Sequence, residues 1–134
     1  MKTKKAYRHN AGSFYNMNYH FVWCPKYRRK VLQPPIDSRL KELLFEKSQE
    51  IGLTIKQLEV MPDHVHIFVT GDPTRPAQWI VNQLKGFTSS VLRQEFPELK
   101  TRLPTLWSRS YFCETIGHIS EETVKKYIQD QKNR

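Results

Sequence analysis

The segment from Pro62 to Thr70 constrains this chain most, because its apolar and polar residues alternate with a period of two. This alternation predicts a β-strand with one buried face. Residues two apart on a strand lie about 6.6–7 Å from each other, so His64 and His66 would stand side by side. Two imidazoles at that spacing can share one metal ion if a third ligand comes from elsewhere, but they can equally occupy a half-exposed strand without any ligand. The buried face would carry Val65, Ile67 and Val69, and the opposite face His64, His66, Phe68 and Thr70.

Apolar periodicity and turn residues predict three further strands and three helices. The strands fall at residues 13–24, 53–61 and 108–116, and the helices at residues 36–50, 76–95 and 120–134, with a loop or short turn at 101–107. The second helix would bury one stripe of its surface, formed by Ile80, Leu84, Phe87, Val91 and Glu95.

This order of elements predicts an α+β fold of the ferredoxin-like, split βαβ type. A four-stranded antiparallel sheet would have two helices on one face, and a C-terminal helix would follow the last strand. The histidine strand would be central, with Val65, Ile67 and Val69 toward the helices and both histidines on the open face.

The length of 134 residues fits a single domain that spans the whole chain. Residues 1–12 are basic and almost without apolar side chains, which predicts a flexible basic N-terminal arm rather than a secretory signal. No apolar run approaches the roughly 18 residues that a membrane span requires, so we expect a cytoplasmic protein. Cys24 and Cys113 lack the spacing of metal ligands and are predicted to be free, buried thiols.

The charge of the chain favours a polyanionic partner. Lys and Arg total 22 against 13 acidic residues, which gives a formal charge of +9 and a pI near 9.7. Nucleic acid is the commonest polyanion that such proteins bind. An anionic membrane surface is the alternative, but no strongly amphipathic basic helix is evident.

Two basic segments are candidates for contact with DNA. Lysine and arginine side chains can bind phosphates while an aromatic ring stacks on an unpaired base. Either segment can also be an ordinary solvated tail or turn. The candidates are Lys4, Lys5 and Arg8 in the N-terminal arm, and Lys26, Tyr27, Arg28, Arg29 and Lys30 after the first strand.

The last predicted helix carries Tyr127 and Gln131 one turn apart, beside an apolar pair formed by Val124 and Ile128. Side chains at i and i+4 lie about 6 Å apart on one face. Taken alone, Tyr127 would be interpreted as a boundary residue that packs its ring. On the first strand, His20 has no partner evident in the sequence and is expected to be a hydrogen-bonded sheet residue rather than a ligand.

Together these features resemble the single-tyrosine HUH transposases of the small bacterial and archaeal insertion sequences, where HUH stands for His, a bulky hydrophobic residue and His. The short C-terminus is similar to the compact mobile-element type rather than to longer domesticated relatives. The matching segments occur in order over nearly the whole chain, at residues 19–30 (YHFVWCPKYRRK), 61–66 (MPDHVH), 106–112 (LWSRSYF) and 124–131 (VKKYIQDQ).

The resemblance implies His64 and His66 as metal ligands, Gln131 as the third protein ligand and Tyr127 as the nucleophile. It implies Mg²⁺ or Mn²⁺ as the cofactor, although two imidazoles alone suit Zn²⁺, Mn²⁺ or Ni²⁺ better than Mg²⁺. An amide oxygen, a phosphate and water would supply the missing oxygen ligands. The resemblance further implies a homodimer with active sites shared between subunits, and single-stranded DNA with hairpin ends as the partner.

The chemistry of such a site explains why a metal would accompany the tyrosine. Free tyrosine has a pKa near 10 and is a weak nucleophile at pH 7. A divalent ion on a phosphate oxygen makes the phosphorus more electrophilic and stabilises the leaving 3′ oxygen. Attack by Tyr127 would leave a 5′-phosphotyrosine and a free 3′ hydroxyl, and a later 3′ hydroxyl would rejoin the strand. One phosphodiester replaces another, so no nucleotide cofactor is required.

Three other functions stay open on the residues alone. A non-catalytic module that binds single-stranded nucleic acid would explain the charge and the aromatic residues, but not the set of His64, His66, Tyr127 and Gln131. A replication initiator or relaxase would use the same chemistry but usually carries extra domains. A zinc hydrolase would leave Tyr127 without a role.

Overall fold

The main feature of the molecule is a four-stranded antiparallel sheet in the order β4-β5-β3-β6. The computed structural model describes residues 8–10, 13–15, 17–71, 74–115 and 121–133. The histidine strand β5 is central, as the sequence predicts. The four strands are β3 (Met17–Trp23), β4 (Thr54–Met61), β5 (His64–Gly71) and β6 (Phe112–Thr115).

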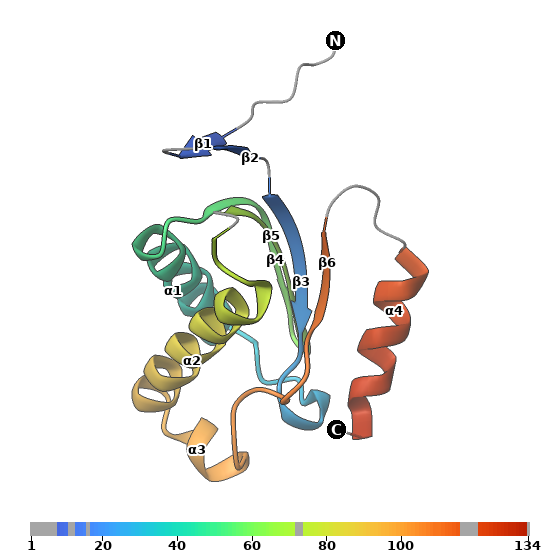
Figure 1. Cartoon of the computed structure of the whole chain (residues 1–134). Helices are drawn as coiled ribbons and strands as arrows, with labels where there is room; N and C mark the ends of the chain where they lie inside the picture. The colour runs from blue at the N-terminus through green and yellow to red at the C-terminus, as the bar shows by residue number, and fades with distance from the viewer. Residues whose placement is uncertain (1–7, 11–12, 16, 72–73, 116–120, 134) are drawn as a thin grey trace.

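Two long helices lie on one side of this sheet, and the last helix lies on the other side, next to β6 (Figure 1). The first two are α1 (Ile36–Glu50) and α2 (Ala77–Glu95), and the last is α4 (Glu121–Asp130). This arrangement confirms the predicted α+β, ferredoxin-like fold with two helices on one face of the sheet and a C-terminal helix that carries Tyr127.

The N-terminal region differs from its prediction. Arg8–Asn10 (β1) pairs antiparallel with Ser13–Tyr15 (β2), so part of the predicted flexible arm is a strand. The strand predicted over residues 13–24 is accordingly divided, and only β3 belongs to the main sheet. The predicted DNA contacts Lys4 and Lys5 lie outside the described residues.

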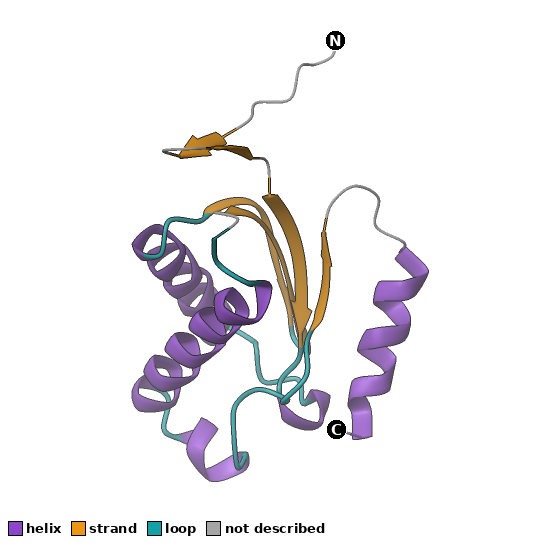
Figure 2. Ribbon diagram, in the orientation of Figure 1, coloured by secondary structure: helices purple, strands orange, loops and turns teal. Residues whose placement is uncertain are grey.

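The core fills the layer between the sheet and the helices α1 and α2 (Figure 2). Side chains alternate between the two faces of a strand, and the three apolar residues of β5 all reach this layer with exposed fractions of 0–1%. The helices complete the core with residues at helical spacing. Buried members of the layer include Val65, Ile67 and Val69 from β5, Leu40, Leu43 and Leu44 from α1, and Ile80, Val81 and Leu84 from α2.

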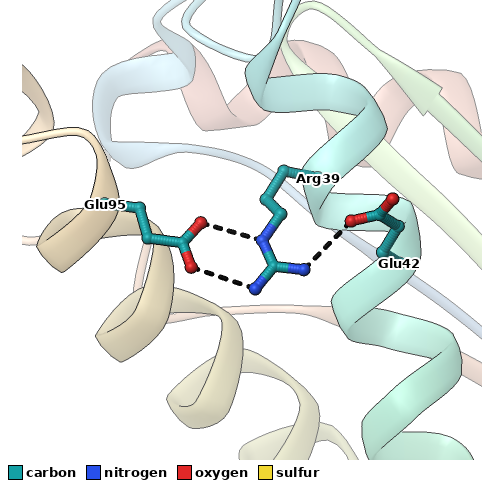
Figure 3. Close-up of polar contacts among 3 residues, drawn as sticks. All are labelled: Arg39, Glu42 and Glu95. Atoms are coloured by element: carbon teal, nitrogen blue, oxygen red, sulfur yellow. Dashed lines mark hydrogen bonds and ion pairs between the residues drawn. The ribbon is translucent and has the colours of Figure 1, made fainter.

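Arg39 of α1 links the two helices at the surface of the molecule (Figure 3). Its guanidinium donates to both carboxylate oxygens of Glu95, at 2.8 and 2.9 Å, and to Glu42 at 3.0 Å. These hydrogen bonds from Arg39 lower the pKa of Glu95. Glu95 is therefore an ion-paired surface residue, and the prediction that it extends the buried stripe of α2 is wrong. The fully buried stripe ends at Leu92. Helical periodicity keeps Glu95 on the same side of α2, but there it meets Arg39 of α1 instead of the core.

The region after α2 also differs in detail from the prediction. A short helix, α3 (Glu98–Arg102), overlaps the start of the predicted loop, and β6 begins at Phe112 rather than at Ser108. The preceding residues pair instead with the end of β3, because the amide of Ser108 donates to the carbonyl of Cys24 at 2.9 Å. The predicted helix cap Ser120 lies outside the described residues.

The end of the chain is a single turn of 3-10 helix, η2 (Gln131–Asn133), which follows α4 directly. Gln131 therefore lies at the junction of the two helices rather than inside α4. Both Cys24 and Cys113 are free thiols, as predicted, but only Cys24 is buried. Cys113 is partly buried, because it lies on the edge strand β6. Among the described residues, no helix combines the length and the apolar character that crossing a bilayer requires.

We expect Ile67→Ala to lower the free energy of unfolding by about 2–5 kcal/mol, because the substitution removes three buried carbon atoms and leaves a cavity. Ile67 is 0% exposed, whereas Met61, the control residue for a Met61→Ala substitution, is 39% exposed. Urea denaturation of the two variants measures the difference. Equal losses of stability would show that β5 does not hold the core together.

Candidate active site

His64 and His66 lie next to each other on the open face of β5, with ring centroids 5.0 Å apart. Each ring uses its Nδ1 atom in a hydrogen bond. His64 pairs with Oδ1 of Asp63 at 2.7 Å, and His66 pairs with Nε2 of His20 at 3.2 Å. The hydrogen bonds of the described residues thus leave both Nε2 atoms for a ligand. Metal-binding histidines usually have this arrangement, because the bond at the second nitrogen fixes the ring.

His20 is a hydrogen-bonded sheet residue, as predicted. It is 2% exposed, and its ring stacks on those of Phe68 and His66, with centroids 4.4 and 5.3 Å away. Burial, followed by the nearby His66, lowers the pKa of His20 to about 4. Burial and then His64 also lower the pKa of His66. Both rings are therefore neutral at pH 7, so that one can donate its proton to the lone pair of the other.

Asp63 and Arg28 connect His64 to helix α4. Nε of Arg28 forms an ion pair with the carboxylate of Asp63 at 3.0 Å, through the oxygen that does not face His64. Arg28 also donates from Nη1 to the backbone carbonyl of Ile128 at 3.1 Å. The side chains of Arg28 and Asp63 are only 17% and 15% exposed. One predicted DNA contact, Arg28, thus has two of its donor atoms engaged inside the chain.

Tyr127 and Gln131 dock against the segment that leads into β6. The amide oxygen of Gln131 accepts hydrogen bonds from the hydroxyls of Ser108 at 3.0 Å and Ser110 at 2.8 Å. The hydroxyl of Tyr127 lies 3.3 Å from that of Ser110. Since Ser110 has a single proton and donates it to Gln131, Tyr127 is the donor in this contact. Gln131 is only 2% exposed.

The structure places the tyrosine and the histidines on the same face of the sheet, and none of the contacts given for the described residues joins them directly. The ring of Tyr127 packs on Phe112, with centroids 5.9 Å apart. Phe112 pairs with Val22, and Val22 pairs with His66. Two strand spacings, about 10 Å in total, therefore separate the backbones of Phe112 and His66. Within one chain, the two predicted halves of the site lie side by side without closing.

The composition of the site shows which residues could hold a metal. Among the described residues, no group of three or more His, Cys, Asp or Glu side chains is suitably placed. The two histidines can supply two nitrogen ligands, and a third ligand must come from another residue type, from substrate or from a second subunit. Gln131 does not supply that ligand in this arrangement, because its amide oxygen accepts hydrogen bonds from Ser108 and Ser110.

The segment that receives α4 is itself fixed by helix α2. Nζ of Lys85 donates to the backbone carbonyls of Ser108 at 2.7 Å and Ser110 at 3.1 Å. Nε1 of Trp107 donates to the hydroxyl of Thr88 at 3.1 Å. No pattern in the sequence predicts a role for Lys85 or for either serine. The only signal was that the serines belong to the matching segment at residues 106–112.

The basic turn, defined here as Lys26 to Lys30, presents Tyr27 at the surface with 44% exposure. Lys26 and Arg29 flank its ring, at 5.2 and 5.9 Å from the centroid. Tyr27 and Arg28 both have positive φ angles, 59° and 52°, which residues other than glycine seldom adopt. A hollow of about 270 Å³ next to the turn is lined by Lys26, Ser108, Arg109 and Ser110. Arg8, the other described candidate, lies in β1, where only its backbone is described.

The comparisons with known proteins identify the class. The family model "Transposase IS200 like" matches residues 13–131, so this chain belongs to the IS200-like transposase family. It is 34% identical to the ISDra2 transposase TnpA of Deinococcus radiodurans over 125 residues, which cover 92% of this chain and 89% of that protein. It is 27% identical to the transposase for insertion sequence element IS200 of Salmonella typhimurium over 123 residues, which cover 90% and 80%.

Solved structures agree with this assignment. A transposase from Deinococcus radiodurans R1 has a TM-score of 0.86 at 32% identity, and the match covers 92% of this chain and 97% of that chain. The REP-associated tyrosine transposase bound to a REP hairpin has a TM-score of 0.59 at 12% identity, with 96% and 68% covered. The second match shows likeness of fold alone. The family resemblance found in the sequence is confirmed.

Lys85 gives the stability of this region a distinct dependence on pH. Burial lowers its pKa from 10.5 to about 8, so between these two values the unfolded chain binds more protons than the folded chain, and stability rises with pH. We expect the difference in unfolding free energy, wild type minus Lys85→Met, to be larger at pH 9.5 than at pH 7.5. Urea denaturation at both pH values measures it. The contributions of other titrating groups cancel, because both proteins contain those groups. A difference in unfolding free energy that is the same at both pH values would contradict the burial of Lys85.

Proposed function

We propose that this transposase cleaves and rejoins single-stranded DNA by transesterification, through a 5′-phosphotyrosine at Tyr127. One observation carries the proposal: the Tyr127 hydroxyl and the two histidines lie on the same face of one sheet. The ring of Phe112 lies between them, with its centroid 5.9 Å from that of Tyr127 and 6.0 Å from that of His20. The hydrogen bonds of the described residues leave the Nε2 atoms of both histidines for a ligand on that face, which a purely structural role does not require.

Tyr127 is the nucleophile in this proposal. Its hydroxyl oxygen attacks the phosphorus, the bond to the 3′ oxygen breaks, and the products are a 5′-phosphotyrosine and a free 3′ hydroxyl. Rejoining reverses these bonds when a 3′ hydroxyl attacks the phosphotyrosine. Each step exchanges one phosphodiester for another, so the reaction consumes no nucleotide. Ser110 contacts the hydroxyl of Tyr127 at 3.3 Å and orients it while α4 is docked next to β6.

The metal site comprises His64 and His66 through Nε2, with Gln131 as the third protein ligand. Both imidazoles are already oriented by bonds at Nδ1. When bound, Mg²⁺ or Mn²⁺ supplies positive charge to the phosphate oxygens. Gln131 must first leave Ser108 and Ser110, whose hydroxyls occupy its amide oxygen.

A homodimer with shared sites would bring the two halves together. In one chain, about two strand spacings separate them, and the hydrogen bonds of Gln131 hold its helix against β6. In the shared arrangement, α4 of one subunit would present Tyr127 to the histidines of its partner.

The partner in this proposal is single-stranded DNA with hairpin ends. The basic turn would bind its phosphates through Lys26, Arg29 and Lys30, and Tyr27 would stack on a base. The exposure of Tyr27 and its flanking cations support this. The hollow beside Lys26 lies next to the serine that contacts Tyr127, which would bring a phosphate on this path close to the nucleophile.

We expect Tyr127→Phe to abolish strand cleavage and covalent adduct formation while hairpin binding stays within about a factor of three, because phosphate contacts dominate affinity for DNA. Denaturing gels with a labelled hairpin strand and Mg²⁺ or Mn²⁺ measure both products, and filter binding measures affinity. Tyr111→Phe is the matched control and should cleave normally. Wild-type protein that binds the strand without cleaving it would favour a non-catalytic binding module.

Mixing two inactive variants tests the shared site. His64→Ala and Tyr127→Phe should each be inactive alone, and subunit exchange should restore part of the cleavage, because one site of the mixed dimer then has an intact histidine pair and an intact tyrosine. The fraction of mixed dimers is measured by mass spectrometry of differently tagged subunits. Mixed dimers without any cleavage would exclude the shared arrangement.

We expect the double substitution Lys26→Gln/Arg29→Gln to weaken DNA binding and to reduce the slope of log affinity against log salt by about 1.4, since each phosphate contact on a single strand contributes about 0.7. The matched control, Lys41→Gln/Lys100→Gln, removes two exposed charges from helices α1 and α3 and should leave the slope unchanged. Equal effects of both pairs would place the DNA elsewhere.

A further inference from the structure

We propose that Asp63 and Arg28 are positioning residues, which orient His64 for metal binding and make that orientation depend on the docking of α4. Neither residue would touch the metal. The inference deepens the proposed function, because it rests on His64 as a metal ligand.

Asp63 fixes the ring of His64 from a rigid turn. Met61 and His64 are paired across β4 and β5, so Pro62 and Asp63 form the two-residue connection between these strands. The carbonyl of Pro62 accepts a hydrogen bond from the amide of Leu32 at 3.0 Å, which ties the connection to the body of the molecule. At 2.7 Å, Asp63 holds the proton of His64 on Nδ1. The lone pair is then on Nε2, where a metal can use it.

Arg28 holds Asp63 in turn. Its Nε forms an ion pair with the second carboxylate oxygen at 3.0 Å, so both oxygens of Asp63 have a partner. The side chain of Arg28 is 17% exposed, although it belongs to the most basic run of the chain. Its φ angle of 52° places its backbone in the left-handed region, an uncommon conformation for arginine. An arginine that only binds phosphate groups at the surface requires neither a largely buried side chain nor a left-handed backbone conformation.

The other end of Arg28 reaches α4. Nη1 donates to the carbonyl of Ile128 at 3.1 Å, and Ile128 directly follows Tyr127 in the sequence. Three consecutive contacts therefore run from the helix that carries the nucleophile to a metal ligand. When α4 leaves its place, Arg28 loses one of its two anchors, and the hold on Asp63 weakens. The metal ligand thereby responds to the position of the tyrosine helix.

The test measures Mn²⁺ binding without DNA, by electron paramagnetic resonance, for wild type, Arg28→Gln, Asp63→Ala and the double variant. The matched control is Arg29→Gln, which removes the neighbouring exposed charge. We expect Arg28→Gln and Asp63→Ala to weaken Mn²⁺ binding, Asp63→Ala by about 10–100-fold. The double variant should bind no more weakly than Asp63→Ala, because Arg28 acts through Asp63. Arg29→Gln should bind as wild type does. Asp63→Asn replaces Asp63→Ala if that variant does not fold.

A spectroscopic readout separates positioning from general structural damage. In metal-free wild type near pH 8, ¹⁵N spectra should show His64 protonated at Nδ1. Asp63→Ala should move the proton partly to Nε2. Ser108→Ala/Ser110→Ala should shift the same signals by releasing Gln131 and α4, although neither serine is bonded to His64. Far-UV circular dichroism confirms that each variant is folded.

Two results would overturn the proposal while leaving the proposed function intact. One is that Arg28→Gln and Asp63→Ala bind Mn²⁺ as tightly as wild type does, while His64→Ala no longer binds it. The other is a double variant whose loss is the product of the two single losses, which would show that Arg28 acts independently of Asp63. Undiminished Mn²⁺ binding by His64→Ala would overturn the metal site itself, and the positioning roles with it.

Discussion

The pleat of β5 is the constraint on which the rest of the structure depends. Its apolar residues must lie against α1 and α2, and this burial, complete at Ile67, leaves only the open face for His64 and His66. A slip of one residue in the register would bury both histidines and expose the core residues. The stability of the core and the position of the histidine pair therefore have the same origin. Because β5 is central, strands on both sides fix that register.

The described contacts that dock α4 have a different character, since they combine the packing of Tyr127 on Phe112 with polar contacts at the edge of the sheet. Gln131 is held by two serine hydroxyls, and Arg28 reaches the carbonyl of Ile128. Such hydrogen bonds each contribute about 0.5–1.5 kcal/mol net, so the helix can exchange them for others at modest cost. A rigid histidine pair and a tyrosine helix that can be released fit a reaction in which the same hydroxyl must form and later give up a bond to DNA.

The sequence predicts most of the fold because periodicity reports burial directly: the alternation around His64 and the helical spacing in α1 define the sheet and its helical layer. It predicts His64, His66 and Tyr127 as one set only through the family resemblance. Contacts between distant segments could not be predicted. Neither the bonds of Gln131 to Ser108 nor the inward position of Arg28 in a basic run has any local signal. Glu95 followed the apolar stripe in sequence, but an arginine on another helix determines its place.

The central claim, that Tyr127 forms the covalent bond to DNA, is tested most directly by locating that bond. A labelled hairpin strand is incubated with wild-type protein and Mn²⁺, the adduct is isolated under denaturing conditions, and nuclease and trypsin digestion precede mass spectrometry. Cleavage after Lys126 and Lys132 yields a peptide of residues 127–132 with a single tyrosine. The account predicts a nucleotide attached through its 5′ phosphate to that tyrosine. An adduct on another peptide, or cleaved strands with free 5′ phosphates and no adduct, would contradict it.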